Sequence, residues 1–290
     1  MESRGRQWIE GLPAELAGQQ ALLRGLLRAC ESDDRFRWLA VACSVGRGAA
    51  DRLSDLDTAL GVTDDQFDSA LADVRAMVDS LGDLVESYHH TLPEVATAHE
   101  RIFAQYADRC QIDLVVFPAT QAIGQVRDVV VLYDQDDRIV VSFEQQPVTA
   151  TQAHEWAFGC WCALIDIGKY LRRGSSWEAL QRLQDARAQL WRIWAASFDV
   201  PNPQYGLTSI LDFAPERLPV QMQETVSDLE PWHLLRAAQS LAAQLSEACG
   251  HLRPDLRATL PMAMECFVTA DLDALEPVLP ISPQGWQDRR

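Results

Sequence analysis

Hydrophobic residues in the first half of the chain recur with two different periods. Leucines between Ala14 and Cys30 fall at the spacing of an amphipathic helix, and the segment Phe67–Leu81 repeats that spacing. The runs Trp38–Cys43 and Leu56–Val62 are short and apolar, as buried strands are. This mixture predicts a small domain in which helices flank a mixed sheet.

Two further pairs of apolar segments in this half predict β-hairpins, each closed by a polar turn. Arg101–Tyr106 pairs with Cys110–Phe117, and Val129–Tyr133 pairs with Ile139–Phe143. The segment around His89 is assigned to a loop. The hairpins would complete the mixed sheet.

Beyond a polar, proline-containing stretch at residues 145–152, the pattern is helical almost throughout. We therefore expect an α+β protein, with the mixed sheet and its flanking helices in residues 1–148 and an all-α helical bundle in residues 149–290. The segments predicted as helices of the bundle are Trp156–Leu171, Trp177–Phe198, Pro231–Ala248 and Leu256–Val268.

Composition and charge narrow the function classes. The chain has 290 residues, of which 48% are hydrophobic and 23% charged, and this is the composition of a globular protein. Asp and Glu number 42 against 25 for Lys and Arg, a net charge of −17. Such a surface repels phosphate backbones and anionic lipids, so we expect no nucleic acid and no membrane as partners. It would attract a polycation, although the charge could also serve solubility alone.

Cysteine usage and the N-terminus indicate the compartment. The seven cysteines form no Cys-x-x-Cys pair, so reduced thiols are expected. The N-terminal residues lack the apolar core of a signal peptide, and no apolar stretch has the length of a membrane span. We therefore predict a cytoplasmic protein.

The stretch from residue 39 to residue 60 carries most of the candidate chemistry. An apolar strand ends in a turn of small residues at Ser44, and a second strand opens on Asp55 and Asp57. Side chains two residues apart in a strand point to the same face, so these carboxylates would stand together. Two neighbouring carboxylates suit Mg²⁺, and the turn offers a hydroxyl and backbone N–H groups to a phosphate.

A third carboxylate, Asp113, falls within an apolar strand. A charge in that position needs a partner, and a metal ion would supply one. In an alternative interpretation, Ser54 caps a helix and Asp55 and Asp57 lie in its exposed first turn. The apolar residues that follow Asp55 fit a strand better than a helix.

This arrangement resembles the nucleotidyltransferase superfamily related to DNA polymerase β, and within it the aminoglycoside nucleotidyltransferases of antibiotic resistance. The family pattern is Gly-Ser, a short spacer, Asp-x-Asp, and a third carboxylate on a later strand. Here it takes the form Cys43-Ser44, ten residues, Asp55-Leu-Asp57 and then Asp113. Cys43 replaces the glycine of the family, a departure that could crowd the approach of a phosphate. The motif covers residues 39–117, and a helical second domain matches the two-domain members.

The resemblance implies a Mg²⁺-dependent adenylyltransferase that moves AMP from ATP to a hydroxyl group of a small cationic acceptor, above all an aminoglycoside. Asp55, Asp57 and Asp113 would hold the metal and act in catalysis. The residues expected to bind the nucleotide are Ser44, Gly46, Arg47, Ser54 and Lys169.

The base that accepts the hydroxyl proton has two candidates under this resemblance. Asp113 is preferred, and Asp166 on the first helix of the second domain is the alternative. Lys169 is the only lysine in the chain and follows Asp166 by one helical turn, from where it could reach a triphosphate. Alternatively, Lys169, Arg172 and Arg173 are cations that favour the C-terminus of a helix.

Other acceptors and functions stay open at this point. The acceptor could be another small hydroxylated antibiotic of the lincosamide type. A toxin-like or regulatory nucleotidyltransferase would instead modify a protein or a tRNA, but the chain lacks the basic patch that a tRNA needs. A module that binds nucleotide without catalysis is the third class.

Overall fold

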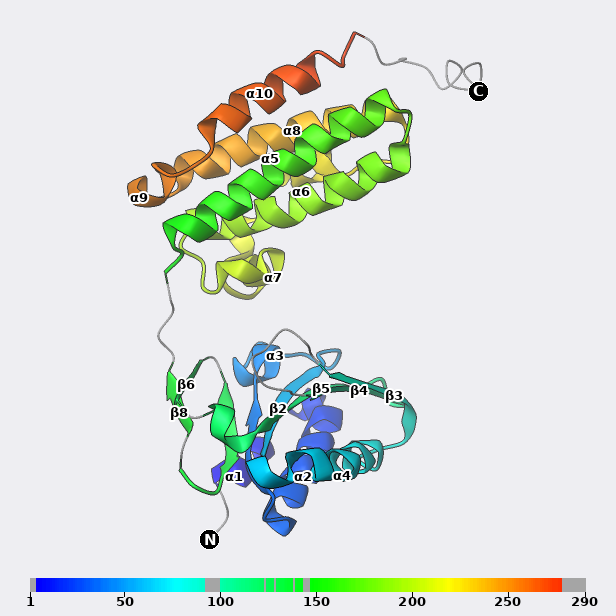
Figure 1. The fold of residues 1–290 in the computed structure, drawn as a ribbon, viewed down its shortest axis with the longest axis vertical. Coiled ribbons are helices and arrows are strands. Elements are labelled where there is room, and N and C mark those ends of the chain that lie inside the picture. Colours follow the sequence, from blue (N-terminus) through cyan, green and yellow to red (C-terminus); the bar gives the residue numbers. More distant parts are fainter. Residues whose placement is uncertain are drawn as a thin grey trace. The chain divides into compact units, whose positions relative to one another are not determined.

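The computed structural model describes residues 4–91, 100–122, 124–127, 129–137, 139–142 and 147–277. The chain divides into two compact units, residues 1–144 and residues 145–290. The first unit holds the strands and the second is helical, so the fold is α+β, a unit with a mixed sheet and helices followed by a helical unit (Figure 1). The predicted boundary between residues 148 and 149 falls next to Thr149, the N-cap of the first long helix of the second unit.

The first unit is built on a six-stranded sheet with the order β3-β4-β5-β2-β1-β7. Its central pair, β2 and β5, is parallel, and the other pairs are antiparallel. A separate pair of parallel strands, β6 and β8, lies outside this sheet. The bounds are β1 Phe36–Val41, β2 Leu56–Val62, β3 Leu84–Thr91, β4 Glu100–Tyr106, β5 Gln111–Pro118, β6 Gly124–Arg127, β7 Val130–Asp134 and β8 Ile139–Ser142.

Helices pack against one face of the six-stranded sheet. Alternate residues of β4 and β5, among them Ile102 and Leu114, are buried with the leucines of α2 and the apolar stripe of α4. The residues between them, such as Arg101 and Asp113, lie on the other face and are partly exposed. We call these the covered face and the open face. The helices of this unit are α1 Arg4–Glu10, α2 Ala17–Ser32, the short α3 Cys43–Gly46 and α4 Phe67–Asp79.

The structure confirms the first predicted hairpin and corrects the second. β4 and β5 pair around the turn at residues 107–109. β7 and β8 do not pair with each other, because β7 joins β1 in the six-stranded sheet and β8 pairs with β6. Phe143, the last residue of the second predicted hairpin, and Arg138 in its turn lie outside the described part of the chain. The loop assignment around His89 is also wrong, since His89 and His90 lie in β3, the edge strand.

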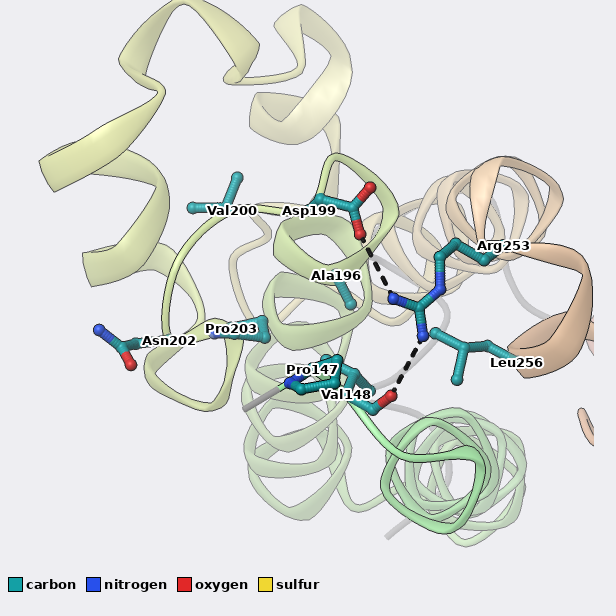
Figure 2. A pocket seen from close by; sticks show the side chains of 9 residues that line it. All are labelled: Pro147, Val148, Ala196, Asp199, Val200, Asn202, Pro203, Arg253 and Leu256. Atoms are coloured by element: carbon teal, nitrogen blue, oxygen red, sulfur yellow. Dashed lines mark hydrogen bonds and ion pairs between the residues drawn. The ribbon is translucent and has the colours of Figure 1, made fainter. Parts of the chain in front are cut away.

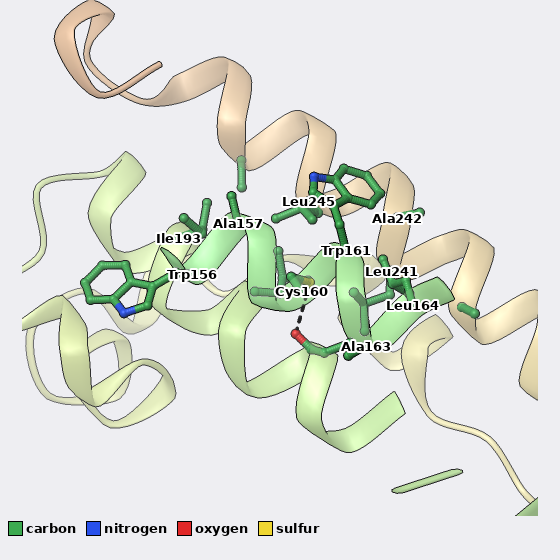
Figure 3. Packing of buried hydrophobic residues seen from close by; sticks show 14 of the residues in the cluster. Trp156, Ala157, Cys160, Trp161, Ala163, Leu164, Ile193, Leu241, Ala242 and Leu245 are labelled. Atoms are coloured by element: carbon green, nitrogen blue, oxygen red, sulfur yellow. Dashed lines mark hydrogen bonds between the residues drawn. The ribbon is translucent and has the colours of Figure 1, made fainter. Parts of the chain in front are cut away.

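The second unit is a bundle built around three long helices. α5, α6 and α8 pack together along their lengths, and α10 lies against α5 and α8 (Figure 1). Small residues such as Ala157 and Cys160 let α5 approach α6, and Leu164 and Leu241 fill the space toward α8 (Figure 3). The bounds are α5 Ala150–Arg172, α6 Ser176–Ser197, α7 Leu207–Phe213, α8 Pro231–His251, α9 Pro254–Arg257 and α10 Met262–Asp273.

The last predicted helix of the bundle, Leu256–Val268, corresponds to two helices, α9 and α10. Pro261 separates α9 from α10, and as a residue without a backbone N–H it interrupts a continuous helix. α7 was not predicted, because it is short and follows a loop rich in proline. In the described residues, no helix combines the length and the apolar character that a membrane crossing requires.

Candidate functional site

Three carboxylates come together at one edge of the six-stranded sheet. Asp57 in β2 and Asp113 in β5 are Cα partners in the parallel pair, and both lie on the open face. Asp55 directly precedes β2 and is exposed. We call these residues the acid edge. The strand interpretation of this segment is confirmed, and the helix-cap alternative is wrong because β2 runs from Leu56 to Val62.

The surroundings of Asp57 in the acid edge disfavour its negatively charged form. Burial, together with the charges of Asp55 and Asp113, raises the pKa of the Asp57 carboxyl group, although a hydrogen bond from Cys43 and the charge of Arg101 oppose this. Burial next to Asp57 also raises the pKa of the Cys43 thiol to about 12, so the thiol stays protonated at neutral pH. The site is therefore short of positive charge at its centre.

Asp113 has a cationic partner in this structure. The Arg101 guanidinium binds both carboxylate oxygens, with 2.8 Å between Nε and Oδ1 and a second, charge-assisted contact between Nη2 and Oδ2. The same guanidinium lies over the ring of Phe103, 4.6 Å from its centroid. Sequence reasoning missed Arg101. The signal was available, because the predicted hairpin puts Arg101 diagonally across from Asp113 on the same face.

The turn after β1 is a short helix rather than an open loop. The amides of Gly46 and Arg47 donate to the carbonyls of Ala42 and Cys43, both at 3.0 Å. These two amides are therefore used within the turn, and the partly buried Ser44 remains the predicted phosphate donor. Cys43 has a φ of 52°, a left-handed conformation that favours glycine.

Ser54 has a structural position just before the acid edge. The Asp51 amide donates to its hydroxyl at 3.0 Å, which closes a turn of residues 51–54. The buried Gln19 side chain of α2 donates to the Ser54 carbonyl at 2.8 Å. These bonds fix the chain where it enters β2, and the role of Ser54 in nucleotide binding stays a prediction.

The donor set at the acid edge fits a hard cation in part. In the described residues, no group of three or more His, Cys, Asp and Glu side chains is arranged to hold a metal ion. Asp55 and Asp57 nevertheless supply the one or two carboxylates through which proteins bind Mg²⁺. Asp113 would first have to exchange Arg101 for the metal. A site of two carboxylates thus fits Mg²⁺ better than the predicted site of three.

Asp166 and Lys169 lie in α5 of the helical unit. They form an ion pair with each other, and Arg182 of α6 approaches Asp166 at 3.9 Å. Arg172, at the end of the same helix, binds Asp271 instead. The predicted contact of Lys169 with a triphosphate, and the alternative role of Asp166 as a base, both stay predictions.

The helical unit also has a small cavity of its own, of about 170 Å³. Figure 2 shows Arg253 between Asp199, at 4.0 Å, and the carbonyl of Val148, at 3.5 Å. Asp199 and Asn202 beside it have left-handed φ angles of 51° and 53°. Because Arg253 and Asp199 compensate each other, this cavity offers a ligand little net charge.

Comparisons with known proteins add little to this geometry. No family model matches the chain, and no curated protein matches its sequence. Among solved structures, the chain is similar to an aminoglycoside 6-adenyltransferase from Bacillus subtilis, at 13% sequence identity and a TM-score of 0.35. The match covers 87% of this chain and 96% of that one.

Proposed function

We propose that this protein is a nucleotidyltransferase that moves AMP from ATP to a hydroxyl group of a small cationic acceptor, such as an aminoglycoside. The acid edge is the observation that carries the proposal. Two neighbouring parallel strands bring Asp57 and Asp113 into register, with Asp55 next to them and Ser44 on the turn that follows the adjoining strand β1.

The residues divide the work of the transfer. Asp55 and Asp57 would hold Mg²⁺, which when bound stabilises charge on the phosphate oxygens. Asp113, held in orientation by Arg101, accepts the proton of the acceptor hydroxyl. The hydroxyl oxygen forms a bond to the α-phosphorus, the bond from that phosphorus to the bridging oxygen breaks, and pyrophosphate leaves.

Charge supports a cationic acceptor. The net charge of −17 and the excess of carboxylates at the acid edge attract polyamines and repel anions. The nucleotide must be neutralised by Mg²⁺ and by arginines or by Lys169. A cationic acceptor would further reduce the repulsion between the triphosphate and the carboxylates of the acid edge as it approaches.

The test is a transfer assay with the full chain. The protein is incubated with ATP labelled at the α-phosphate, Mg²⁺ and a panel of aminoglycosides, and both pyrophosphate release and the mass of the acceptor are followed. We expect pyrophosphate only when acceptor and Mg²⁺ are both present, with an acceptor heavier by one AMP. The proposal fails if no nucleoside triphosphate is consumed with any acceptor, or if consumption does not depend on the acceptor.

A further inference from the structure

A hollow of about 440 Å³ lies on the open face of the sheet, next to the acid edge. Strands β3, β4 and β5 form its floor, and two residues of the acid edge, Asp55 and Asp113, line it on one side. All of its lining residues belong to the first unit, so its shape does not depend on the helical unit. The side chains that give it chemical character are Asp55, Glu86, Tyr88, Phe103, Gln111 and Asp113.

Two aromatic side chains form a platform in this hollow. Tyr88 and Phe103 are Cα partners on adjacent strands, and they are 63% and 38% exposed. The His90 ring stacks against each of them, with its centroid 5.5 Å from that of Tyr88 and 6.1 Å from that of Phe103. Aromatic rings so exposed gain by stacking against a saturated ring or a cation. The platform therefore offers a ligand an exposed aromatic contact surface.

The charged side chains that line the hollow are acidic, and Arg101, which lies over the Phe103 ring of the platform, is paired with Asp113. The described residues that line the hollow include three with carboxylates, Asp55, Glu86 and Asp113, and no lysine, arginine or histidine. Arg101 neutralises the charge of Asp113. Neither Asp55 nor Glu86 forms an ion pair with another described residue. Such a lining repels a triphosphate and attracts an ammonium group.

We infer that this hollow binds the acceptor, a saturated ring with ammonium and hydroxyl groups. The inference rests on the proposed function and assigns the acceptor subsite to particular residues. The ring lies on Tyr88 and Phe103, and Glu86 binds an ammonium group. The far side of the ring then reaches Asp113, which places a hydroxyl group beside the base that accepts its proton. Tyr88 and Glu86 thus select the acceptor, while the acid edge carries out the transfer.

The experiment measures acceptor binding without nucleotide or Mg²⁺. Calorimetry of the full chain with kanamycin and streptomycin is compared with spermine, trehalose and ATP, for the wild type and for the variants Tyr88→Ala and Glu86→Gln. Both positions are exposed, so both variants should fold. Matched controls are Val85→Ala, equally exposed on the same strand, and Asp68→Asn, an exposed acid of α4.

We expect each of the two variants to weaken aminoglycoside binding about 10-fold or more, and the controls to leave it unchanged. Tyr88→Ala should affect spermine less than the aminoglycosides, because spermine has no ring to stack, and trehalose should bind weakly because it has no charge. The inference is overturned if no aminoglycoside binds, if both variants bind like the wild type, or if the variants weaken ATP binding instead.

Failure of this inference is distinguishable from failure of the proposed function. If transfer proceeds with unchanged acceptor KM in Tyr88→Ala and Glu86→Gln, the acceptor binds elsewhere and the proposed function stands. If the aminoglycosides bind as expected but no triphosphate is consumed, the hollow binds cations but the proposed transfer activity is wrong.

Discussion

On the covered face of the six-stranded sheet, Leu60, Leu114 and Val116 are completely buried beneath helices. On the open face, the same strands present Asp57 and Asp113. A single step along each strand separates apolar packing from charge, because successive side chains point to opposite faces. The comparison indicates that residues of the covered face determine stability, whereas the proposed chemistry belongs to residues of the open face.

One charged residue of the covered face qualifies this division. Glu100 in β4 is 3% exposed, and its carboxylate binds the Arg75 guanidinium of α4 with both contacts at 2.5 Å. The pair links the sheet to a helix, as the apolar residues around it do. Its position on the covered face makes it structural, in contrast to Arg101 and Asp113 on the open face.

The largest effect should come from Asp57→Asn on the open face. Loss of a carboxylate from the proposed metal site should slow transfer at least about 10,000-fold, which corresponds to about 5.4 kcal/mol. The thermal unfolding midpoint should stay the same or rise, because the amide removes a charge that burial and two neighbouring acids disfavour. Asp68→Asn is the control for loss of one acid. Near-normal turnover in Asp57→Asn with a normal midpoint would contradict the assignment.

Arg75→Ala should have the opposite profile, with a loss of stability. It removes the guanidinium from the buried Glu100 carboxylate and leaves the His89 ring nitrogen 3.7 Å away, which should lower the free energy of unfolding by about 3 kcal/mol. Urea denaturation measures the loss, and the refolded fraction should keep its affinity for the acceptor. As a control, Arg24→Ala breaks an ion pair with Glu10 that lies on the surface, and should change the transition little. If Arg75→Ala and Arg24→Ala lowered the free energy of unfolding equally, the stabilising role assigned to the covered face would be contradicted.

Lys169→Ala tests whether the helical unit also contributes to chemistry. If Lys169 binds the triphosphate, its loss should lower kcat/KM for ATP about 10-fold, or about 1.4 kcal/mol, with little change in stability. Acceptor binding without nucleotide should hardly change. Arg173→Ala is the neighbouring control. If both variants leave the ATP dependence untouched and shift only the unfolding midpoint, the cations serve the helix end.

The smallest effect should come from Cys43→Gly at the turn after β1. Glycine adopts the φ of 52° without strain, so the free energy of unfolding should rise by about 1 kcal/mol. Arg109→Gly in the β4–β5 turn relieves a φ of 76° and is the matched control. Both should stabilise the protein, but only Cys43→Gly should alter the KM for ATP. A loss of stability in Cys43→Gly would mean that the thiol contact with Asp57 outweighs the strain.

Much of the fold follows from the sequence where one period dominates. α6 and α8 were predicted to within three residues at both ends, because apolar residues recur at helical spacing through each of them. The end of α5 was predicted to within one residue, but its start was placed six residues too late. β3 could not be predicted in this way. It is an edge strand whose residues are mostly exposed, so it lacks the alternation of buried and exposed positions that identifies a strand.

The acid edge was predicted in part, because the register of β2 and β5 is a property of the tertiary fold. The spacing of Asp55 and Asp57 placed two carboxylates together, and the isolated charge of Asp113 pointed to a third. The predicted hairpin already placed Arg101 near Asp113, although its ion pair was not inferred from it. Nothing in the sequence indicated that Tyr88 reaches the same hollow, because that depends on the unpredicted strand β3 and its pairing with β4. The partners of a charge are therefore harder to predict than the charge itself.

The parallel pairing of β2 with β5 has a consequence for how the protein folds. The β4–β5 hairpin closes through a short local turn, whereas β2 meets β5 only after the intervening α4, β3 and β4 have been bridged. Contacts between residues distant in the chain cost more loop entropy and form more slowly. On the ribosome, Asp57 is synthesised well before its partner strand exists. We therefore expect helices and hairpins to form first and the acid edge to be assembled among the last steps of folding.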